Sequence, residues 1–344
     1  MIGVSFSTLE VQKLYPLMIS RGMMSSSENL FVFVTDGIHT GVGELSPATG
    51  SSWTAERGQK QLEAFAAEGI ADNPFENYAQ MRRANIDPPA MAALDMALWD
   101  LLGKQAGMPL YRLLGLPKST HPTSVTIGIN PPEVTRERVP AILSATGAKC
   151  LKIKLGSPQG REHDREHFLA AAAAAKPFGA KLRVDANGGW TVNEAITMIG
   201  WLADHGVDYV EQPLAEGHED GLPDVFANRR LPIFVDETIR YSPDVIGVAD
   251  RVDGINLKLM KCGGITEALR IVATARAYGL QTMIGCMSET SIAIAAGAAI
   301  GGLFDHIDLD SHLNLKPDPA TGAPIIDGVI VPTENPGHGA ALNA

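Results

Sequence analysis

Cysteine is scarce in this sequence, which has three cysteines among 344 residues: Cys150, Cys262 and Cys286. Their number is odd, they lie far apart, and no two form a CxxC pair, so the sequence does not predict a disulfide framework. Long apolar runs are also lacking, since none reaches the roughly 18 residues that a membrane span needs. The first residues do not show the basic, apolar and small-residue order of a signal peptide. We therefore expect a reduced, cytoplasmic protein.

Positive charge is in deficit. Lysine and arginine number 28 against 39 aspartates and glutamates, which gives a formal net charge of −11. Nucleic acid phosphates would be repelled by such a chain, so we expect a small-molecule partner, with no nucleic acid and no membrane. A homo-oligomer is possible. The apolar content of 45% is ample for the core of one large domain or two.

Eight short apolar segments dominate the chain from residue 119 onward, and helix-like segments separate them. The predicted strands are Thr123–Ile129, Cys150–Lys154, Lys181–Asp185, Val207–Glu211, Ile233–Asp236, Gly254–Lys258, Gln281–Cys286 and His306–Asp310. Eight apolar strands joined by helices predict a closed parallel barrel whose functional residues stand at the strands' C-terminal ends. Because no helix follows the eighth strand, the predicted fold is a modified TIM barrel, (β/α)7β, of the α/β class.

The part before the barrel has a different pattern. Residues 1–46 read as a β-meander with a polar, mobile loop at Ile19–Glu28, and residues 54–114 read as helical. We therefore expect an α+β domain over residues 1–118 and the barrel over 119–312. The tail, residues 313–344, is rich in proline and glycine and is expected to pack back on the first domain.

Three carboxylates stand at the ends of adjacent predicted strands. Asp185, Glu211 and Asp236 are 26 and 25 residues apart, close to the length of one strand-plus-helix unit. Converging carboxylates repel one another unless a cation lies between them, and Mg²⁺ prefers oxygen ligands. The spacing therefore predicts a magnesium site.

Lysines occupy the ends of the second and sixth strands. Lys152 and Lys154 share one face of their strand, and we expect their mutual repulsion to lower the pKa of at least one towards that of a general base. Lys258 ends the sixth strand, with Asn256 on the same face. Since these strands are nearly opposite in the barrel, Lys154 and Lys258 could remove a proton α to a carboxylate on one face and return it on the other. A metal would stabilise the enediolate.

These motifs together resemble the enolase superfamily, in its muconate-lactonizing subgroup. The likeness rests on the K-x-K pair, the three carboxylates and the N-x-K pair, and on the segments Ala93–Lys104 and Pro109–Gly115, which are similar to the subgroup's capping domain. It spans essentially the whole chain and implies lysine bases on strands two and six, with an N-terminal domain that covers the barrel.

The eighth strand narrows the resemblance. Asp308 and Asp310 are similar to the D-x-D with which dipeptide epimerases hold the substrate's α-ammonium group. Arg21 resembles the loop arginine that reads a glutamate side chain, and Cys286 and Ser288 resemble residues that border the bound dipeptide. The resemblance thus implies an isomerase, a Mg²⁺-dependent dipeptide epimerase with L-Ala-D/L-Glu as the favoured substrate.

Other functions stay open at this point. The same scaffold supports o-succinylbenzoate synthesis, muconate cycloisomerisation and N-acylamino-acid racemisation, against which the D-x-D weighs. His163 and His167 fit the H-x-x-E-H pattern of a zinc peptidase, although a charged, solvated helix face is the more ordinary interpretation. A barrel that binds a ligand without catalysis is the third alternative.

Overall fold

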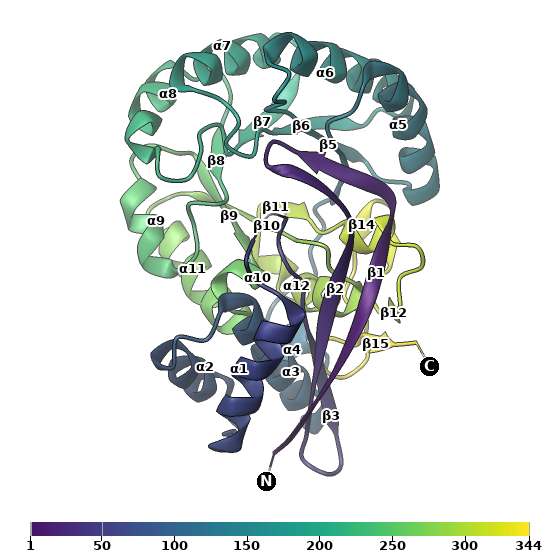
Figure 1. Ribbon diagram of the computed structural model, residues 1–344, viewed down its shortest axis with the longest axis vertical. Helices are drawn as coiled ribbons and strands as arrows, with labels where there is room; N and C mark the ends of the chain where they lie inside the picture. The colour runs from purple at the N-terminus through teal and green to yellow at the C-terminus, as the bar shows by residue number, and fades with distance from the viewer. Residues whose placement is uncertain (1, 50, 344) are drawn as a thin grey trace.

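A long hairpin and a short third strand begin the chain. The computed structural model describes residues 2–49 and 51–343, and its first sheet contains β1 (Gly3–Ile19), β2 (Gly22–Thr35) and β3 (Thr40–Leu45) in that order. The prediction of a mobile loop over Ile19–Glu28 is wrong. Its residues continue the two strands up to a turn at Ser20 and Arg21, with Ile19 paired to Gly22, because an antiparallel hairpin accepts serines wherever one side faces water. The hairpin tip reaches across to the barrel (Figure 1).

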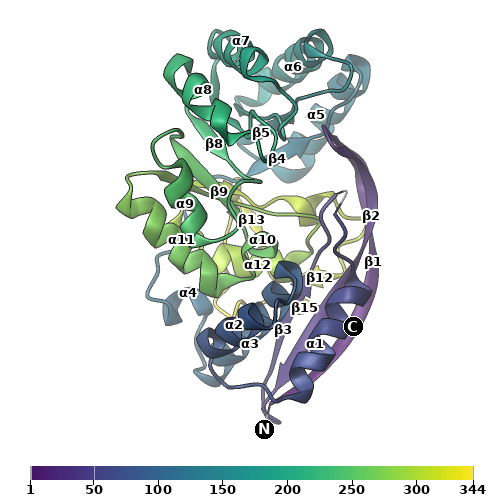
Figure 2. The ribbon, with the colours of Figure 1, turned by 60° about the vertical axis from the view of Figure 1, so that its left-hand side comes forward.

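Four helices follow: α1 (Ala55–Ala67), α2 (Pro74–Arg83), α3 (Pro88–Gln105) and α4 (Leu110–Leu113). The side chains of Thr54 and Asn73 cap the first two by accepting backbone N–H groups, as their sequence signals predict. Helix α3 lies against β3 without intervening side chains. A Cβ atom on Gly41 or Gly43 would stand 2.0 Å from a carbonyl oxygen of α3. These elements form the smaller, lower part of the molecule (Figure 2).

Eight parallel strands form the barrel that the sequence predicts. They are β4 (Ser124–Ile127), β5 (Cys150–Lys154), β6 (Lys181–Asp185), β7 (Val207–Glu211), β8 (Ile233–Val235), β9 (Gly254–Lys258), β10 (Gln281–Gly285) and β11 (His306–Asp308). Each pairs with the next, and a bridge between Thr123 and Ile307 joins the last strand to the first. The register sets Lys154 beside Asp185 and Asp185 beside Glu211, so the three lie at one level of the barrel wall.

Helices cover the outside of the barrel (Figure 1). They are α5 (Pro132–Thr146), α6 (Arg161–Ala175), α7 (Val192–Ala203), α8 (Leu222–Asn228), α9 (Ser242–Val248), α11 (Ile265–Ala277) and α12 (Ser291–Ala299). The single turn α10 (Leu259–Cys262) directly follows β9 and packs against α3. Apolar side chains from the strands and these helices form one continuous core, while Tyr209, Phe234 and Met283 make a separate cluster. The core thus holds the strand ends in fixed positions.

The tail after β11 returns to the N-terminal elements. It carries four two-residue strands, β12 (Ala320–Thr321), β13 (Ile325–Ile326), β14 (Val329–Ile330) and β15 (Ala341–Leu342). The Gly337 carbonyl accepts the Leu110 N–H at 2.7 Å, and the His338 N–H donates to Asp100 Oδ1 at 2.9 Å. The last residues therefore lie against α3 and α4, and the domain limits at residues 118 and 312 remain a proposal.

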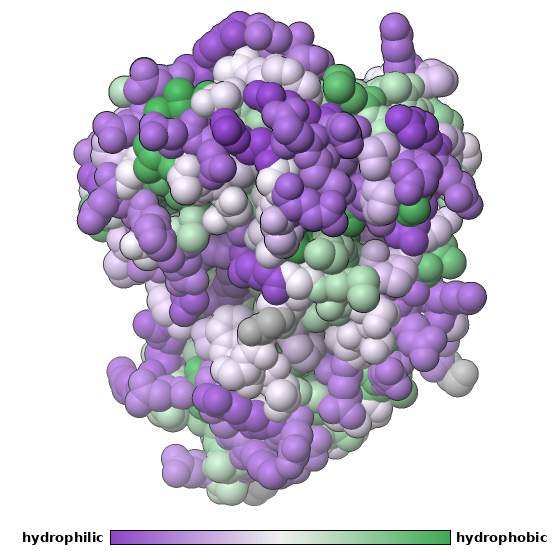
Figure 3. Space-filling model, turned by 45° about the horizontal axis from the view of Figure 1, so that its top comes forward, coloured by the Kyte–Doolittle hydropathy of each residue, from purple (hydrophilic) through white to green (hydrophobic). Residues whose placement is uncertain are grey.

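The surface seen in Figure 3 is mostly hydrophilic, with apolar side chains in scattered patches. Among the helices within residues 2–49 and 51–343, none combines the length and apolar character required to cross a bilayer.

Candidate active site

A cleft of about 990 Å³ lies between the hairpin tip and the C-terminal ends of the barrel strands. Lys154, Asp236 and Lys258 line it from the barrel. Arg21 lines it from the hairpin, and Cys286, Met287 and Ser288 line it from the loop after β10. The structure therefore brings lysines, a carboxylate and the hairpin arginine of the sequence prediction to one cavity.

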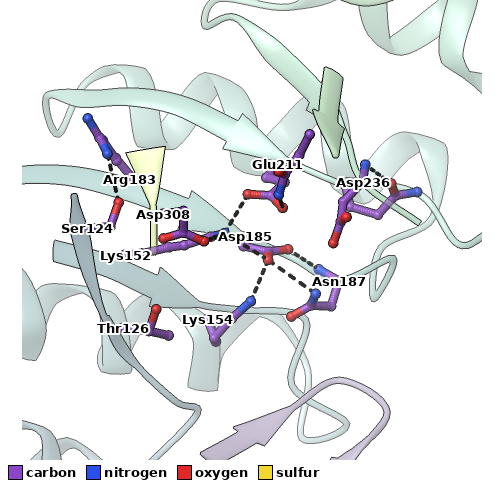
Figure 4. A network of polar contacts seen from close by, with 12 residues as sticks. Ser124, Thr126, Lys152, Lys154, Arg183, Asp185, Asn187, Glu211, Asp236 and Asp308 are labelled. Atoms are coloured by element: carbon purple, nitrogen blue, oxygen red, sulfur yellow. Dashed lines mark hydrogen bonds and ion pairs between the residues drawn. The ribbon is translucent and has the colours of Figure 1, made fainter. Parts of the chain in front are cut away.

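The three predicted metal ligands form a buried cluster beneath this cleft (Figure 4). Asp185 ends β6, Glu211 ends β7, and Asp236 follows β8 directly, and all three side chains are buried. Burial raises the pKa of Glu211 to about 7, and the nearby Asp185 carboxylate adds to the rise. The three buried carboxylates repel one another, so their charged forms require positive charge nearby.

Ammonium groups provide that charge on the β5 side. Lys152 Nζ lies 2.6 Å from both Glu211 Oε2 and Asp308 Oδ2, and Lys154 Nζ lies 2.5 Å from Asp185 Oδ2. The expected fall in lysine pKa is wrong for Lys152, whose pKa is raised well above its ordinary value. Burial favours the neutral amine, but the surrounding carboxylates outweigh it. Each ammonium faces acids rather than the other ammonium.

Two lysines approach the cluster from the other side. Lys258 Nζ lies 2.9 Å from Asp236 Oδ2, while Lys261 contacts Asp236 Oδ1 and the backbone carbonyl of the same residue. Burial alone would raise the pKa of Asp236, but these two cations depress it strongly. Asn256 Nδ2 donates to Glu211 Oε1 at 2.7 Å. The sequence prediction missed Lys261, although a lysine within the apolar run Leu259–Cys262 is an unusual residue for a buried turn.

The donor set fits a hard divalent cation. Glu211 Oε2 and both Asp236 oxygens contact lysine ammonium groups but meet no well-aligned hydrogen-bond donor among the described residues, so a metal could replace these ammonium contacts. Between residues 2 and 49 and between 51 and 343, no three acidic, histidine or cysteine side chains are already gathered at metal-binding spacing. Lysine ammonium groups lie against oxygens that a cation would bind.

The two aspartates of the eighth strand lie near the cluster but differ in conformation. Asp308 ends β11, whereas Asp310 follows the strand and starts a turn, so the predicted common strand face is not continuous. Asp308 Oδ1 is buried and meets no donor among the described side chains and backbone groups. Asp310 accepts the Thr126 N–H at 2.7 Å and lies 3.7 Å from Cys286 Sγ. Asp308 therefore has the freer acceptor.

The loop that carries Ser288 is fixed by the N-terminal sheet. Asn29 Nδ2 donates to the Ser288 carbonyl at 2.8 Å and to Glu44 Oε1 at 2.6 Å. Glu44 in turn accepts the backbone N–H groups of Thr290 and Ala293 at the start of α12. The sequence prediction missed this network. Its signal is a pair of polar residues, Asn29 and Glu44, at buried positions of two otherwise apolar strand ends.

Arg21 stands at the hairpin tip, but it is already paired. Its Nη1 lies 2.6 Å from Glu237 Oε1 and donates to the Asn187 carbonyl at 3.1 Å. Glu237, which the sequence prediction did not single out, directly follows Asp236 and lines the same cleft. The structure therefore joins the hairpin tip to the barrel rim through a charged contact.

The rival histidine motif lies outside the cleft. His167 of α6 is completely buried, and its Nδ1 lies 2.8 Å from Thr135 Oγ1 of α5. Burial lowers its pKa to about 4, so the imidazole is neutral. His163 and His167 do not line the cavity, and the zinc peptidase interpretation loses its structural basis.

Comparison with known proteins agrees with this geometry. Residues 1–115 match the mandelate racemase / muconate lactonizing enzyme N-terminal domain, and residues 135–344 match the enolase C-terminal domain-like family. A hydrophobic dipeptide epimerase of Roseobacter litoralis is 58% identical over 99% of both chains. An L-Ala-D/L-Glu epimerase of Bacteroides thetaiotaomicron is 35% identical over 87% of this chain and 77% of its own. The crystal structure of a dipeptide epimerase from Enterococcus faecalis, complexed with Mg and L-Leu-L-Tyr, is similar with a TM-score of 0.89, 32% identity and 98% coverage of both chains.

Proposed function

The chain belongs to the mandelate racemase/muconate lactonizing enzyme family of the enolase superfamily, and on that premise we propose that it is a Mg²⁺-dependent dipeptide epimerase. It would invert the α-carbon of the dipeptide's C-terminal residue. The observation that carries the proposal is the placement of Lys154 and Lys258, which reach the buried carboxylates from different strands and both line the cleft.

The chemistry needs one lysine as a neutral amine and the other as an ammonium group. The neutral amine takes the α-proton and becomes an ammonium ion, which leaves the electron pair in a planar enediolate. The opposite ammonium then gives its proton to the other face of the α-carbon and becomes neutral. Because β5 and β9 are separated by three strands of the barrel, Lys154 and Lys258 are suited to serve the two faces. Lys152 lies between the acids and would support Lys154.

The metal would be held by Asp185, Glu211 and Asp236, all of them oxygen donors. Bound there, Mg²⁺ would withdraw electron density from the substrate carboxylate and make the α-proton more acidic. Asn256 orients Glu211 through its amide and so supports the same group of acids.

The substrate's ammonium group would lie near Asp308 and Asp310. Asp308 Oδ1 is buried and meets no donor within the described chain, so it can accept from a cation. Cys286 and Ser288 line the cleft, and Cys286 Sγ lies 3.7 Å from Asp310 Oδ1. An acceptor of this kind favours a free amino terminus over the uncharged or anionic groups that muconate and N-acylated substrates would present there.

The side chain of the C-terminal residue is a separate question. The L-Ala-D/L-Glu preference predicted from Arg21 remains a proposal, and relatives of this chain include both an L-Ala-D/L-Glu epimerase and hydrophobic dipeptide epimerases. We also propose that the enzyme acts in the cytoplasm, in keeping with its three free cysteines.

The test is proton exchange in heavy water. The protein with Mg²⁺ should exchange the C-terminal α-proton of one or more L,L-dipeptides for deuterium and produce the L,D-epimer. Mass spectrometry measures the exchange across a dipeptide library, and chiral chromatography measures the epimer. A protein that exchanges no α-proton in any dipeptide of the library would contradict the proposal.

A further inference from the structure

A buried aspartate lies within the histidine motif of α6, which forms no part of the cleft. Asp164 stands in the first turn of this helix and is 1% exposed. Its Oδ2 accepts the Gly156 N–H at 2.9 Å and the Trp190 Nε1–H at 3.1 Å. Its Oδ1 accepts the Ser157 N–H at 2.9 Å. One carboxylate thus accepts hydrogen bonds from two separate loops, the loop after β5 and the loop after β6.

The backbones of these two loops lie in direct contact. A Cβ atom on Gly189 would stand only 2.5 Å from the Gly156 Cα, so the close approach requires glycine there. The Leu155 N–H also donates to the Asp185 carbonyl at 2.8 Å, which continues the pairing of β5 and β6 beyond the last residue of β5. The Asp164 carboxylate therefore ties together two loops that already touch.

The tied loops adjoin one of the two lysines on which the proposed reaction depends. Lys154 directly precedes the first loop, and its Nζ lies 2.5 Å from Oδ2 of Asp185, the last residue of β6 (Figure 4). Residues of both loops line the cleft. Lys258 ends β9, which three strands of the barrel separate from β5. The Asp164 contacts therefore lie on the Lys154 side of the cleft.

We propose that Asp164 is a positioning residue for the reaction: by tying the loop after β5 to the loop after β6, it holds the Lys154 amine in place for proton transfer on one face of the α-carbon. The inference rests on the proposed epimerase function and adds to it a residue that does not line the cleft. Because Asp164 acts through Lys154, its loss should slow one of the two proton transfers more than the other. A general loss of folded protein would slow both alike.

The decisive variant is Asp164→Asn, which keeps the size of the side chain but turns an NH₂ group towards at least one of the three donors. Exchange of the α-proton in heavy water is measured separately on the L,L and L,D forms of one dipeptide, and Lys154→Ala shows which form depends on Lys154. In Asp164→Asn the exchange rate of that form relative to the other should fall about fivefold or more, because misplacing a reacting group by about 1 Å can cost roughly 100-fold in rate. The KM of the dipeptide should change by less than about threefold.

Asp253→Asn is the matched control. Asp253 also accepts a backbone N–H, that of Ile233 at 2.9 Å, but Ile233 begins β8 at the end of the barrel away from the cleft. The ratio of the two exchange rates should stay within about twofold of the wild-type ratio in this variant. An equal fall of the ratio in both variants would show a general effect of lost stability and overturn the proposal, as would an unchanged ratio in Asp164→Asn.

Trp190→Phe tests the tie without changing the acid. Phenylalanine keeps an aromatic ring in the loop after β6 but has no N–H for Asp164, so the carboxylate loses its bond to that loop. The ratio should fall in the same direction as in Asp164→Asn but by less, and this variant decides the question if Asp164→Asn does not fold. Equal slowing of both forms would overturn the inference. Absence of wild-type exchange with every dipeptide defeats the epimerase function itself, whereas wild-type exchange with an unaltered ratio in the variants defeats only the role of Asp164.

Discussion

The Lys152 ammonium lies 2.6 Å from Asp308 Oδ2, and this contact joins the second strand of the barrel to the eighth. It uses one oxygen of the aspartate and leaves Oδ1 buried with no donor among the described groups. Asp308 thus contacts Lys152 through its side chain and Cys286 through its backbone carbonyl, which lies 3.3 Å from Cys286 Sγ, beside the proposed ammonium site.

Asp308→Asn should weaken the binding of dipeptides that have a free amino terminus. The amide keeps the shape but loses the charge that pairs with the substrate ammonium, so kcat/KM should fall by roughly 10- to 100-fold. Steady-state kinetics with L-Ala-L-Leu measures the loss. A variant that retains wild-type kcat/KM would show that the ammonium binds elsewhere.

Replacing Lys154 or Lys258 should separate removal of the α-proton from its return on the opposite face. Lys258→Ala and Lys154→Ala should each lower epimerisation by roughly 10²- to 10⁴-fold, since one proton-transfer group is missing. Each variant should still exchange the α-proton of one epimer in heavy water, and the two variants should differ in which epimer that is. Exchange of the same epimer by both would place the two amines on one face of the substrate.

Removing the metal should abolish exchange, and Glu211→Gln should weaken metal binding. Mg²⁺ at 100 times its dissociation constant would stabilise the wild-type fold by about 2.7 kcal/mol, which is visible as a rise in the thermal midpoint. The rise should be clearly smaller in Glu211→Gln, whereas Glu216→Gln, an exposed acid of the same rim, should behave like the wild type. Equal rises in all three proteins would mean that Mg²⁺ binds outside this cluster.

Glu44→Gln should destabilise the contact between the N-terminal sheet and the barrel. Glu44 is fully buried and accepts N–H groups of Thr290 and Ala293, and an amide NH₂ would face one of these donors. The loss should be roughly 1–3 kcal/mol and should lower the urea midpoint. Glu56→Gln is the control, since its contact with Lys60 is exposed to solvent and should change the urea midpoint far less. Equal falls of the urea midpoint in the two variants would show that Glu44 does not stabilise the start of α12.

Asp95 should make stability depend on pH. Burial raises its pKa to about 7 in the folded protein, above the ordinary value for an aspartate, so the folded state holds its proton longer than the unfolded chain. Its contribution is complete below about pH 4 and is lost as the pH rises to about 7. Asp95→Asn should therefore lose less stability than the wild type between about pH 4 and pH 7 in urea unfolding. Parallel losses would show that Asp95 does not titrate in this range.

Most of the barrel could be predicted because the strands are short apolar runs, and most of them end at a charged residue or directly before one. Four of the eight strands have the predicted limits, and the last strand ends at Asp308 instead of Asp310; the four are Cys150–Lys154, Lys181–Asp185, Val207–Glu211 and Gly254–Lys258. The same regularity located the three buried acids. The roles of the individual site residues remain predictions, which the experiments above address.

What sequence reasoning missed depends on contacts between distant segments. Ile19–Glu28 looked like a loop because its serines and glycine are poor strand formers, but pairing across the hairpin overrides that propensity. Glu237 gave no signal because its partner, Arg21, is 216 positions away. The pKa of Lys152 could not be judged either, since charge balance inside a barrel depends on which side chains face one another.

The turn at Ser20 and Arg21 and the barrel strands should differ in how well they tolerate substitutions during evolution. The lysines that we propose to move protons lie on barrel strands with paired neighbours on both sides, while the turn contacts the rim through a few polar atoms. Substitutions in the turn should therefore disturb the buried lysines and acids less than substitutions on the strands. The sequence of this turn can therefore vary during evolution with little effect on the barrel.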